Sequence, residues 1–404
     1  MNFKKDFPIF DNNPGLIYLD STATSQKPSF VIDGIKEYLE NDYANIHRGS
    51  YSLSERSEEM YKKSKEITAK FIGSTDYREI IYTYNANYAL NLLSASLKRS
   101  QLLKKGDKVL ISVVEHHSNI VPWLILKEEI GIEIDYVNID ENFGIDFEDF
   151  EKKFTADVKL VSFTAVSNVT GEIFNLEKLG TLIKKKNKDI LFVVDASQSV
   201  PHIPLDVKKV QCDFTFFTGH KLMADTGIGI IWGKKEILNT MKPAFSGGGA
   251  ISKVLKDCFY DAPLPDRFEA GTPNLSGAVS LLKAFEYIEK IGGYETLITH
   301  EQELIEYTLK KFESIPGVKL IGGKNKESKV GVFSFIIEGI HSIDISEYLA
   351  TKNICIRAGQ HCAEPFLTSL GLAHTCRMSL YIYNTMEDID IFFEELKNAI
   401  ITLQ

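Results

Sequence analysis

The chain has 404 residues, of which 44% are hydrophobic and 25% are charged, and this balance is ordinary for a globular protein rather than a disordered one. A chain of this length exceeds what one hydrophobic core usually supports, so two domains are expected. The net charge is −9 and the main lysine cluster, at positions 184–188, falls at the end of a predicted helix, which argues against a nucleic-acid partner.

Two further features predict a cytoplasmic protein without a membrane partner. Charged residues and prolines between positions 6 and 14 interrupt any apolar run that could serve as a secretory signal, and no segment approaches the roughly 18 apolar residues that span a bilayer. The five cysteines have no C-x-x-C spacing, which predicts neither a disulfide framework nor a zinc site. They are Cys212, Cys258, Cys355, Cys362 and Cys376.

Helices and strands alternate over most of the chain. The predicted order is helix 54–72, strand 108–113, helix 119–129, strand 132–137, helix 146–154, strand 158–164 and helix 176–186, followed by strands at 190–194, 214–217 and 227–232. Several of these strands, such as 190–194, are continuous apolar runs. Such runs are typical of strands that helices cover on both faces of a parallel sheet, so we expect a large α/β domain.

The pattern changes near residue 280. Two helices are predicted at 280–291 and 295–315, then strands at 318–321 and 330–337, a helix at 343–351 and a final helix at 386–402. This order predicts a smaller α+β domain. We expect residues 21–284 to form the large domain, residues 285–404 the small C-terminal domain, and residues 1–20 a segment that packs with the small domain.

Polar residues that could take part in catalysis or cofactor binding follow three of the predicted strands. Asp195 and Gln198 follow strand 190–194, Lys221 follows strand 214–217, and His116 follows strand 108–113. Ligands of an open parallel sheet collect at the carboxyl ends of its strands. Each residue alone has an ordinary explanation, such as a helix cap or a solvated lysine. Together they match pyridoxal phosphate (PLP), which needs a lysine for its Schiff base and a carboxylate for its ring nitrogen.

Whole segments of the sequence resemble the class V aminotransferase superfamily of fold-type I PLP enzymes, and within it the SUF-type (group II) cysteine desulfurases. The resemblance implies a mainly parallel seven-stranded sheet flanked by helices in the large domain. The matching segments are Tyr18–Ser21, Asn45–Gly49, Glu115–Trp123, Val166–Val169, Asp195–Gln198, Gly219–Leu222, Arg267–Asn274, Arg357–Gly359 and Tyr383–Thr385.

The resemblance also implies a set of cofactor contacts. Lys221 would form the Schiff base, Asp195 would pair with the ring nitrogen, and His116 would stack on the ring and shuttle protons. The remaining contacts would be Gln198 and Asn168 at the ring hydroxyl, Thr218, His220, Ala86 and Asn87 at the phosphate, and Thr272 at the phosphate from the second subunit of a homodimer. No metal is expected.

The same resemblance assigns the substrate pocket and the reaction. Arg377 would bind the substrate carboxylate through two parallel hydrogen bonds, and Arg357, His47 and Asn168 would line the pocket. Cys362 would attack the sulfur of L-cysteine, which leaves L-alanine and a persulfide. The persulfide sulfur would pass to a small acceptor protein of the SUF system for iron–sulfur cluster assembly.

The sequence departs from the family at the phosphate cup. The family usually has Gly-Thr-Thr where this chain has Asn85-Ala86-Asn87, so two hydroxyl donors are missing and only Asn87 offers a side-chain replacement. Asp225 adds a carboxylate after the lysine loop that has no explanation at this level. Two alternatives stay open: a selenocysteine lyase, and a non-catalytic scaffold that binds PLP weakly.

Overall fold

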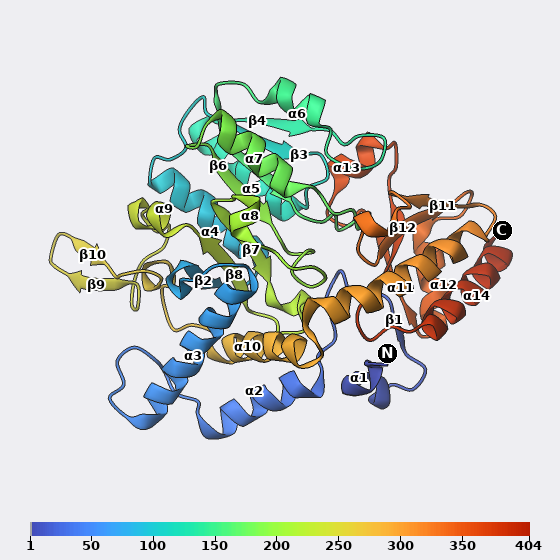
Figure 1. The fold of residues 1–404 in the computed structure, drawn as a ribbon, viewed down its shortest axis with the longest axis horizontal. Coiled ribbons are helices and arrows are strands. Elements are labelled where there is room, and N and C mark those ends of the chain that lie inside the picture. The colour runs from blue at the N-terminus through green and yellow to red at the C-terminus, as the bar shows by residue number, and fades with distance from the viewer. Residues whose placement is uncertain (1) are drawn as a thin grey trace.

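The computed structural model describes residues 2–404, and its largest element is a seven-stranded sheet (Figure 1). The strand order is β2 (Ile80–Thr83), β8 (Gly229–Gly233), β7 (Phe214–Thr218), β6 (Leu191–Asp195), β5 (Val158–Thr164), β3 (Lys108–Ser112) and β4 (Glu133–Val137). The five strands from β7 to β4 are parallel, and β8 runs antiparallel to both of its neighbours. The expectation of a mainly parallel seven-stranded sheet is confirmed.

Helices cover both faces of this sheet, as its buried strands predict. Apolar side chains of alternate strand residues pack on one face against α4 (Ala86–Arg99), α5 (Val121–Ile130) and α9 (Lys235–Thr240). On the other face they pack against α6 (Phe147–Lys153), α7 (Leu176–Lys186) and α8 (Val207–Val210). The helices α2 (Ser29–Asn41), α3 (Ser52–Phe71) and α10 (Leu275–Lys290) lie together below the sheet (Figure 1).

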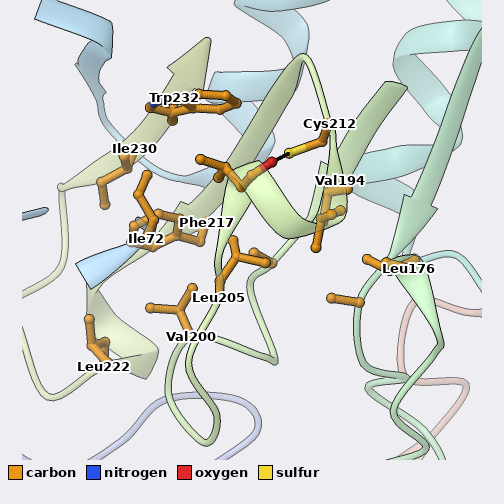
Figure 2. Packing of buried hydrophobic residues seen from close by; sticks show 14 of the residues in the cluster. Ile72, Leu176, Val194, Val200, Leu205, Cys212, Phe217, Leu222, Ile230 and Trp232 are labelled. Carbon is orange, nitrogen blue, oxygen red and sulfur yellow. Dashed lines mark hydrogen bonds between the residues drawn. The ribbon is translucent and has the colours of Figure 1, made fainter. Parts of the chain in front are cut away.

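Figure 2 shows part of the core on the α8 side. Val194, Phe217 and Ile230 come from three neighbouring strands and belong to one apolar cluster with Ile72 and Leu205. All five are shielded from solvent, with at most 7% of each exposed. Burial of this order is worth about 1.5–3 kcal/mol for each large aliphatic or aromatic side chain, so the core holds the strand ends in a fixed relative position.

A second sheet forms the core of the C-terminal region. It is antiparallel, with the order β11 (Val318–Ile321), β12 (Val332–Ile337), β15 (Thr375–Ser379) and β14 (Arg357–Gly359). The helices α11 (Gly293–Glu313), α12 (Ser342–Thr351) and α14 (Met386–Leu403) pack on it through a separate apolar cluster. A short helix, α13 (Glu364–Ser369), follows β14.

The N-terminal segment runs beside this second sheet. After α1 (Pro8–Asn12), the two-residue strand β1 (Ile17–Tyr18) pairs in parallel with β13 (Ile354–Cys355). Asp20 continues along the same edge and bridges to Ser379. The bounds 1–20, 21–284 and 285–404 remain predictions, and the last of them falls within α10.

The hairpin of β9 (Ile251–Val254) and β10 (Phe259–Asp261) was not foreseen from the sequence, and it projects from the edge of the large sheet (Figure 1). None of the helices formed by residues 2–404 has both the length and the apolar character that crossing a bilayer requires.

Candidate active site

A cavity of about 470 Å³ opens at the carboxyl ends of β5, β6 and β7. Its volume is within the roughly 300–1,000 Å³ that small-ligand sites occupy. Residues of the second sheet close its other side. The predicted site residues that line it are Lys221, Asp195, Gln198, His116, Thr218, His220, Asn168, Ala86, Asn87, Arg357, Arg377 and Cys362.

The lysine and the acid come from adjacent parallel strands. Asp195 is the last residue of β6, and Lys221 ends the short 3-10 turn Gly219–Lys221 that follows β7. Gly219 begins this turn because a Cβ there would lie 2.6 Å from Ile228 Cγ2. Burial lowers the pKa of Lys221 to about 8, against the opposing effect of the Asp195 charge. Burial also raises the pKa of Asp195, although the Ser197 N–H donates to its carboxylate at 2.9 Å.

Three buried polar atoms of the cavity fit the cofactor that the sequence predicts. Thr218 Oγ1, Ser197 Oγ and Gln198 Oε1 have no hydrogen-bond partner anywhere in residues 2–404. The amide nitrogen of Gln198 is already used, because it donates to the Thr22 carbonyl at 2.9 Å. An unpaired buried polar group costs about 1–3 kcal/mol. A ligand that carries a phosphate and a ring hydroxyl would satisfy these atoms, so the residues present fit PLP.

The N-terminus of α4 lines the cavity with Asn85, Ala86 and Asn87. Asn85 caps this helix, and its side chain accepts from Tyr88 N at 2.8 Å. Ala86 and Asn87 stand in the first turn, where backbone N–H groups have no partner within the helix and suit an anion. Asn85 is therefore occupied as a cap, and of the two asparagines only Asn87 has a side chain free of that structural role.

His220 also lines the cavity. Burial lowers its pKa to about 4, and the charges of Lys221 and Lys27 act in the same direction. The imidazole is therefore neutral at pH 7 and can donate one hydrogen bond to a phosphate oxygen. Lys27 donates to the carbonyl of Ser25 at 2.6 Å, and burial lowers its pKa to about 8 while the Asp225 charge opposes that shift.

His116 is held by the loop that follows β3. Its Nδ1 accepts from Ser118 N at 3.1 Å, which leaves the proton of the neutral ring on Nε2. Burial lowers its pKa to about 3, and the Lys221 charge adds to this effect.

The neighbouring Glu115 is fully buried and accepts from Thr164 N at 3.0 Å and from Asn119 Nδ2 at 2.7 Å. Burial raises the Glu115 pKa to about 8. Glu115 is part of a matching segment, but its anchoring role was missed.

Two arginines enter the cavity from the second sheet. Arg377 is buried, donates from Nη1 to the Asn168 carbonyl at 3.0 Å, and lies 3.4 Å from the carboxylate of Asp20. Its Nε has no partner among the described residues, which leaves a donor for a substrate carboxylate. Burial lowers the pKa of Arg377 to about 10. Arg357 is half-exposed and pairs with Asp20 at 2.8 Å. The bridging role of Asp20 was also missed.

Cys362 is exposed at the mouth of the cavity, in the turn between β14 and α13. His361 and Cys362 have φ values of 55° and 54°, a left-handed conformation that residues other than glycine rarely adopt. The turn is held by Asn168 Nδ2, which donates to the His361 carbonyl at 2.8 Å, and by a 2.9 Å contact of His361 Nε2 with Thr375 Oγ1. Strained turns that their surroundings fix in this way are common at functional sites.

Two predicted residues do not line this cavity within one chain. His47 is exposed in the loop before α3. Thr272 lines a separate cavity with Tyr84, Tyr88 and Phe245. The segment that carries Thr272 is anchored by Glu269, which accepts from Tyr61 Oη at 2.7 Å and from Tyr82 N at 2.6 Å.

Comparison with known proteins agrees with this geometry. The family model described as "Aminotransferase class-V" matches residues 17–392. The chain is 39% identical over 401 residues to a probable cysteine desulfurase of Synechocystis sp., covering 98% of this chain and 94% of the relative. It is 37% identical over 402 residues to a probable cysteine desulfurase of Pyrococcus abyssi, covering 99% and 98%.

Two solved structures have the same fold over nearly the whole chain. The apo structure of cysteine desulfurase from Thermococcus onnurineus NA1 has a TM-score of 0.93 and 36% identity, covering 99% of this chain and 98% of that one. The cysteine desulfurase CsdA from Escherichia coli, solved in an S-sulfonic acid form, has a TM-score of 0.91 and 29% identity, covering 100% and 98%. On these matches, this chain belongs to the class V aminotransferase family.

Proposed function

We propose that this chain is a PLP-dependent cysteine desulfurase, which converts L-cysteine to L-alanine and collects the sulfur as a persulfide on Cys362. The observation that carries the proposal is that an amine, a carboxylate, a guanidinium and a thiol line one cavity. These groups belong to Lys221, Asp195, Arg377 and Cys362. The two relatives named above are described as probable cysteine desulfurases, and their matches cover 98% and 99% of this chain.

The residues that would hold PLP follow from the polar groups of the cavity. Asp195 would bind the ring nitrogen, Gln198 and Asn168 the ring hydroxyl, and Thr218 with His220 the phosphate. Backbone N–H groups of Ala86 and Asn87 would complete the phosphate cup. When bound, PLP supplies an electron sink for the bonds at the substrate Cα.

The protein's own groups then bind the substrate and move protons. Arg377 binds the substrate carboxylate, since its buried Nε has no other partner among residues 2–404. The Lys221 amine takes the proton from the substrate Cα, because a pKa of about 8 gives a fraction of neutral amine at pH 7. His116 stays neutral and acts as a ring surface and hydrogen-bonding group.

Cys362 performs the sulfur step. Its thiolate forms a bond to the sulfur of the bound cysteine while the carbon–sulfur bond of the substrate breaks, and the substrate carbon takes up a proton. The overall change converts L-cysteine and the Cys362 thiol into L-alanine and the Cys362 persulfide. No external oxidant or reductant is needed, because the electron pair of the broken carbon–sulfur bond stays on the substrate carbon. That carbon is reduced to the methyl group of alanine while the two sulfur atoms are oxidised to a persulfide. Arg357 lines the same cavity as the Cys362 thiol.

We also propose a homodimer in which Thr272 reaches the phosphate of the partner's site. Exposed apolar side chains line the cavity that contains Thr272, and further ones lie on the β9–β10 hairpin. They are Tyr84, Tyr88, Phe245, Val254, Leu255, Phe259 and Tyr260, of which Val254 is 61% and Tyr84 60% exposed. Apolar patches of this kind mark protein–protein contacts. A second copy would cover this patch and bring a hydroxyl that the single chain lacks at its own site.

The sulfur acceptor is proposed to be a small protein with a reactive thiol, of the SUF iron–sulfur assembly system. The exposed position of Cys362 supports this, because a persulfide at the mouth of the cavity is accessible to a partner thiol. The Cys362 thiol stays free to react in a compartment that keeps thiols reduced, so we propose the cytoplasm as the location.

A visible spectrum of the purified protein tests the main proposal. We expect cofactor absorbance that changes on addition of L-cysteine, and alanine formation in the presence of a reductant. Lys221→Ala should lose the covalently bound cofactor. A protein that shows no cofactor absorbance even after PLP is added would instead be a scaffold. Faster turnover of selenocysteine than of cysteine would assign it as a lyase for that amino acid.

Cys362→Ser tests the role of the thiol, with Cys258→Ser as the matched control because Cys258 is another exposed cysteine. We expect Cys362→Ser to keep the cofactor absorbance and lose persulfide, while the control keeps both.

Mixed dimers test the position of Thr272. Thr272→Glu should bind PLP poorly by itself, and mixing it with Lys221→Ala should restore one intact site per mixed dimer. Failure of mixing to restore any cofactor binding would contradict a contribution from the second subunit.

A further inference from the structure

The turn that carries Cys362 is attached to the large domain at three points. Asn168 Nδ2 donates to the His361 carbonyl at 2.8 Å. The backbone N–H of His117 donates to the Cys362 carbonyl at 2.8 Å. The ring of His117 then makes the third attachment, because its Nε2 lies 2.6 Å from Oε2 of Glu364. His117 thus holds the turn both at the reactive residue and two residues after it.

The third attachment differs from the other two in its position. Asn168 lines the cavity, whereas neither His117 nor Glu364 does. Both side chains are partly exposed, at 36% for His117 and 44% for Glu364. Glu364 is the first residue of α13, and this six-residue helix begins directly after the turn. The pair can therefore be altered without removing any group that faces the cofactor or the substrate.

The turn needs such support because of its backbone. His361 and Cys362 are consecutive residues with positive φ, and neither is glycine. Without external contacts, this segment would relax toward more common conformations. Relaxation would move the Cys362 thiol away from the mouth of the cavity, where it has to meet the sulfur of the substrate.

We propose that His117 and Glu364 form a positioning pair that holds the Cys362 turn against the large domain while sulfur is taken up. This proposal rests on the desulfurase function proposed above. His117 acts through Cys362 and does not touch the substrate. The pair links the turn to the loop that carries His116, so the thiol and the imidazole that flanks the cavity keep a fixed relative position.

Hydrogen exchange on the complete protein tests the structural half of the proposal. Glu364→Ala and His117→Asn each remove the ring contact, and His117→Asn keeps the backbone N–H that binds Cys362. We expect amide exchange in a peptide covering residues 358–370 to become about two- to fivefold faster in either variant, as suits a partly exposed side-chain contact. Because the two residues act as one pair, the double variant should exchange no faster than the single ones.

Glu387→Ala is the matched control, since Glu387 is also an exposed acidic residue in the first turn of a helix in the C-terminal region. It should leave exchange in residues 358–370 unchanged. Exchange in the Glu364→Ala and His117→Asn proteins equal to that of the control would overturn the proposal. This measurement needs no turnover, so its outcome is separate from the success or failure of the proposed reaction.

Kinetics test the functional half. Arg377 and Asp20 are untouched in these variants, so KM for L-cysteine should stay within about twofold of the parent value. We expect kcat for persulfide formation to fall about two- to fivefold. A rise in KM with an unchanged kcat would place the pair in substrate binding and overturn its assignment as a support for the thiol.

Discussion

Arg357 lies directly opposite Arg377 in the antiparallel pairing of β14 with β15. Two cations on neighbouring strands repel each other, and the structure compensates with one carboxylate, since both guanidinium groups reach Asp20. Asp20 comes from the N-terminal segment beside the same sheet. This arrangement holds two guanidinium groups at one wall of the cavity, where a substrate carboxylate can bind.

Replacement of Arg377 by lysine is expected to raise KM for L-cysteine about 10- to 100-fold. Lysine keeps the charge but cannot offer two parallel donors, and hydrogen bonds to charged groups contribute about 1.5–3 kcal/mol. Steady-state kinetics measure the effect, with Arg357→Lys as the control because Arg357 is half-exposed and already paired with Asp20. Equal KM values in the two variants would contradict the assignment of Arg377 as the carboxylate site.

Asp20→Asn is expected to lower the free energy of unfolding by about 1–3 kcal/mol, because the buried Arg377 loses its nearby anion. The same change should strengthen the binding of small carboxylates, since Asp20 no longer competes for the guanidinium groups. Urea titration measures the first effect, and inhibition by acetate or propionate measures the second. Weaker binding of these anions in the variant would show that Asp20 orients the arginines rather than competing with the substrate.

The sequence alone predicted the bounds of elements that have a strong periodic pattern. Strand 158–164, helix 176–186 and strand 318–321 were predicted with the bounds that the structure has. Long apolar runs and a regular amphipathic pattern depend little on tertiary context. Helix α10 begins at Leu275 rather than at the predicted residue 280. Ser276 and Gly277 do not favour a helix in the sequence, but the Asn274 side chain caps this first turn by accepting from Gly277 N.

The elements that the sequence missed owe their form to distant partners. β15 has a buried charged residue, Arg377, in its middle, and a pattern of residues alone does not favour such a strand. The ion pair of Asp20 with Arg357 joins residues 337 positions apart. The motif around Asp20 was recognised, but its partner depends on the pairing of β1 with β13. The contact of His117 with Glu364 likewise depends on the tertiary structure, because it forms only when the two sheets lie next to each other.

The pKa of Lys221 predicts how cofactor loading depends on pH. Burial lowers this pKa from its ordinary value to about 8, so the neutral amine that can attack an aldehyde becomes abundant near pH 8. We expect the rate of PLP incorporation into cofactor-free protein to rise about tenfold per pH unit below pH 7.5 and to level off above about 8. Absorbance after mixing measures this rate. Arg377→Gln removes a cation that lowers the Lys221 pKa, so the midpoint should move to higher pH. A rate that still rises steeply between pH 9 and 10 would contradict the shift.

The buried ring of His361 predicts a loss of stability in mild acid. Burial and the Arg377 charge lower its pKa to about 3, below the ordinary value of about 6.5 that applies to the unfolded chain. As pH falls from 6.5 toward 3, His361 binds a proton in the unfolded chain but not in the folded one. The stability present above pH 6.5 is therefore lost by up to about 1.4 kcal/mol per pH unit.

His361→Gln removes this titration and keeps an amide that can reach Thr375. Urea unfolding at pH 6.5 and 5.5 should give a smaller loss of stability in this variant than in the parent, by about 1 kcal/mol. His341→Gln is the control, because His341 is exposed at the start of α12 and does not contact the Cys362 turn. An acid dependence of His361→Gln identical to that of the parent would mean that the ring is protonated in the folded protein. The turn around Cys362 would then hold a cation next to the thiol, instead of the neutral imidazole that burial and the Arg377 charge favour.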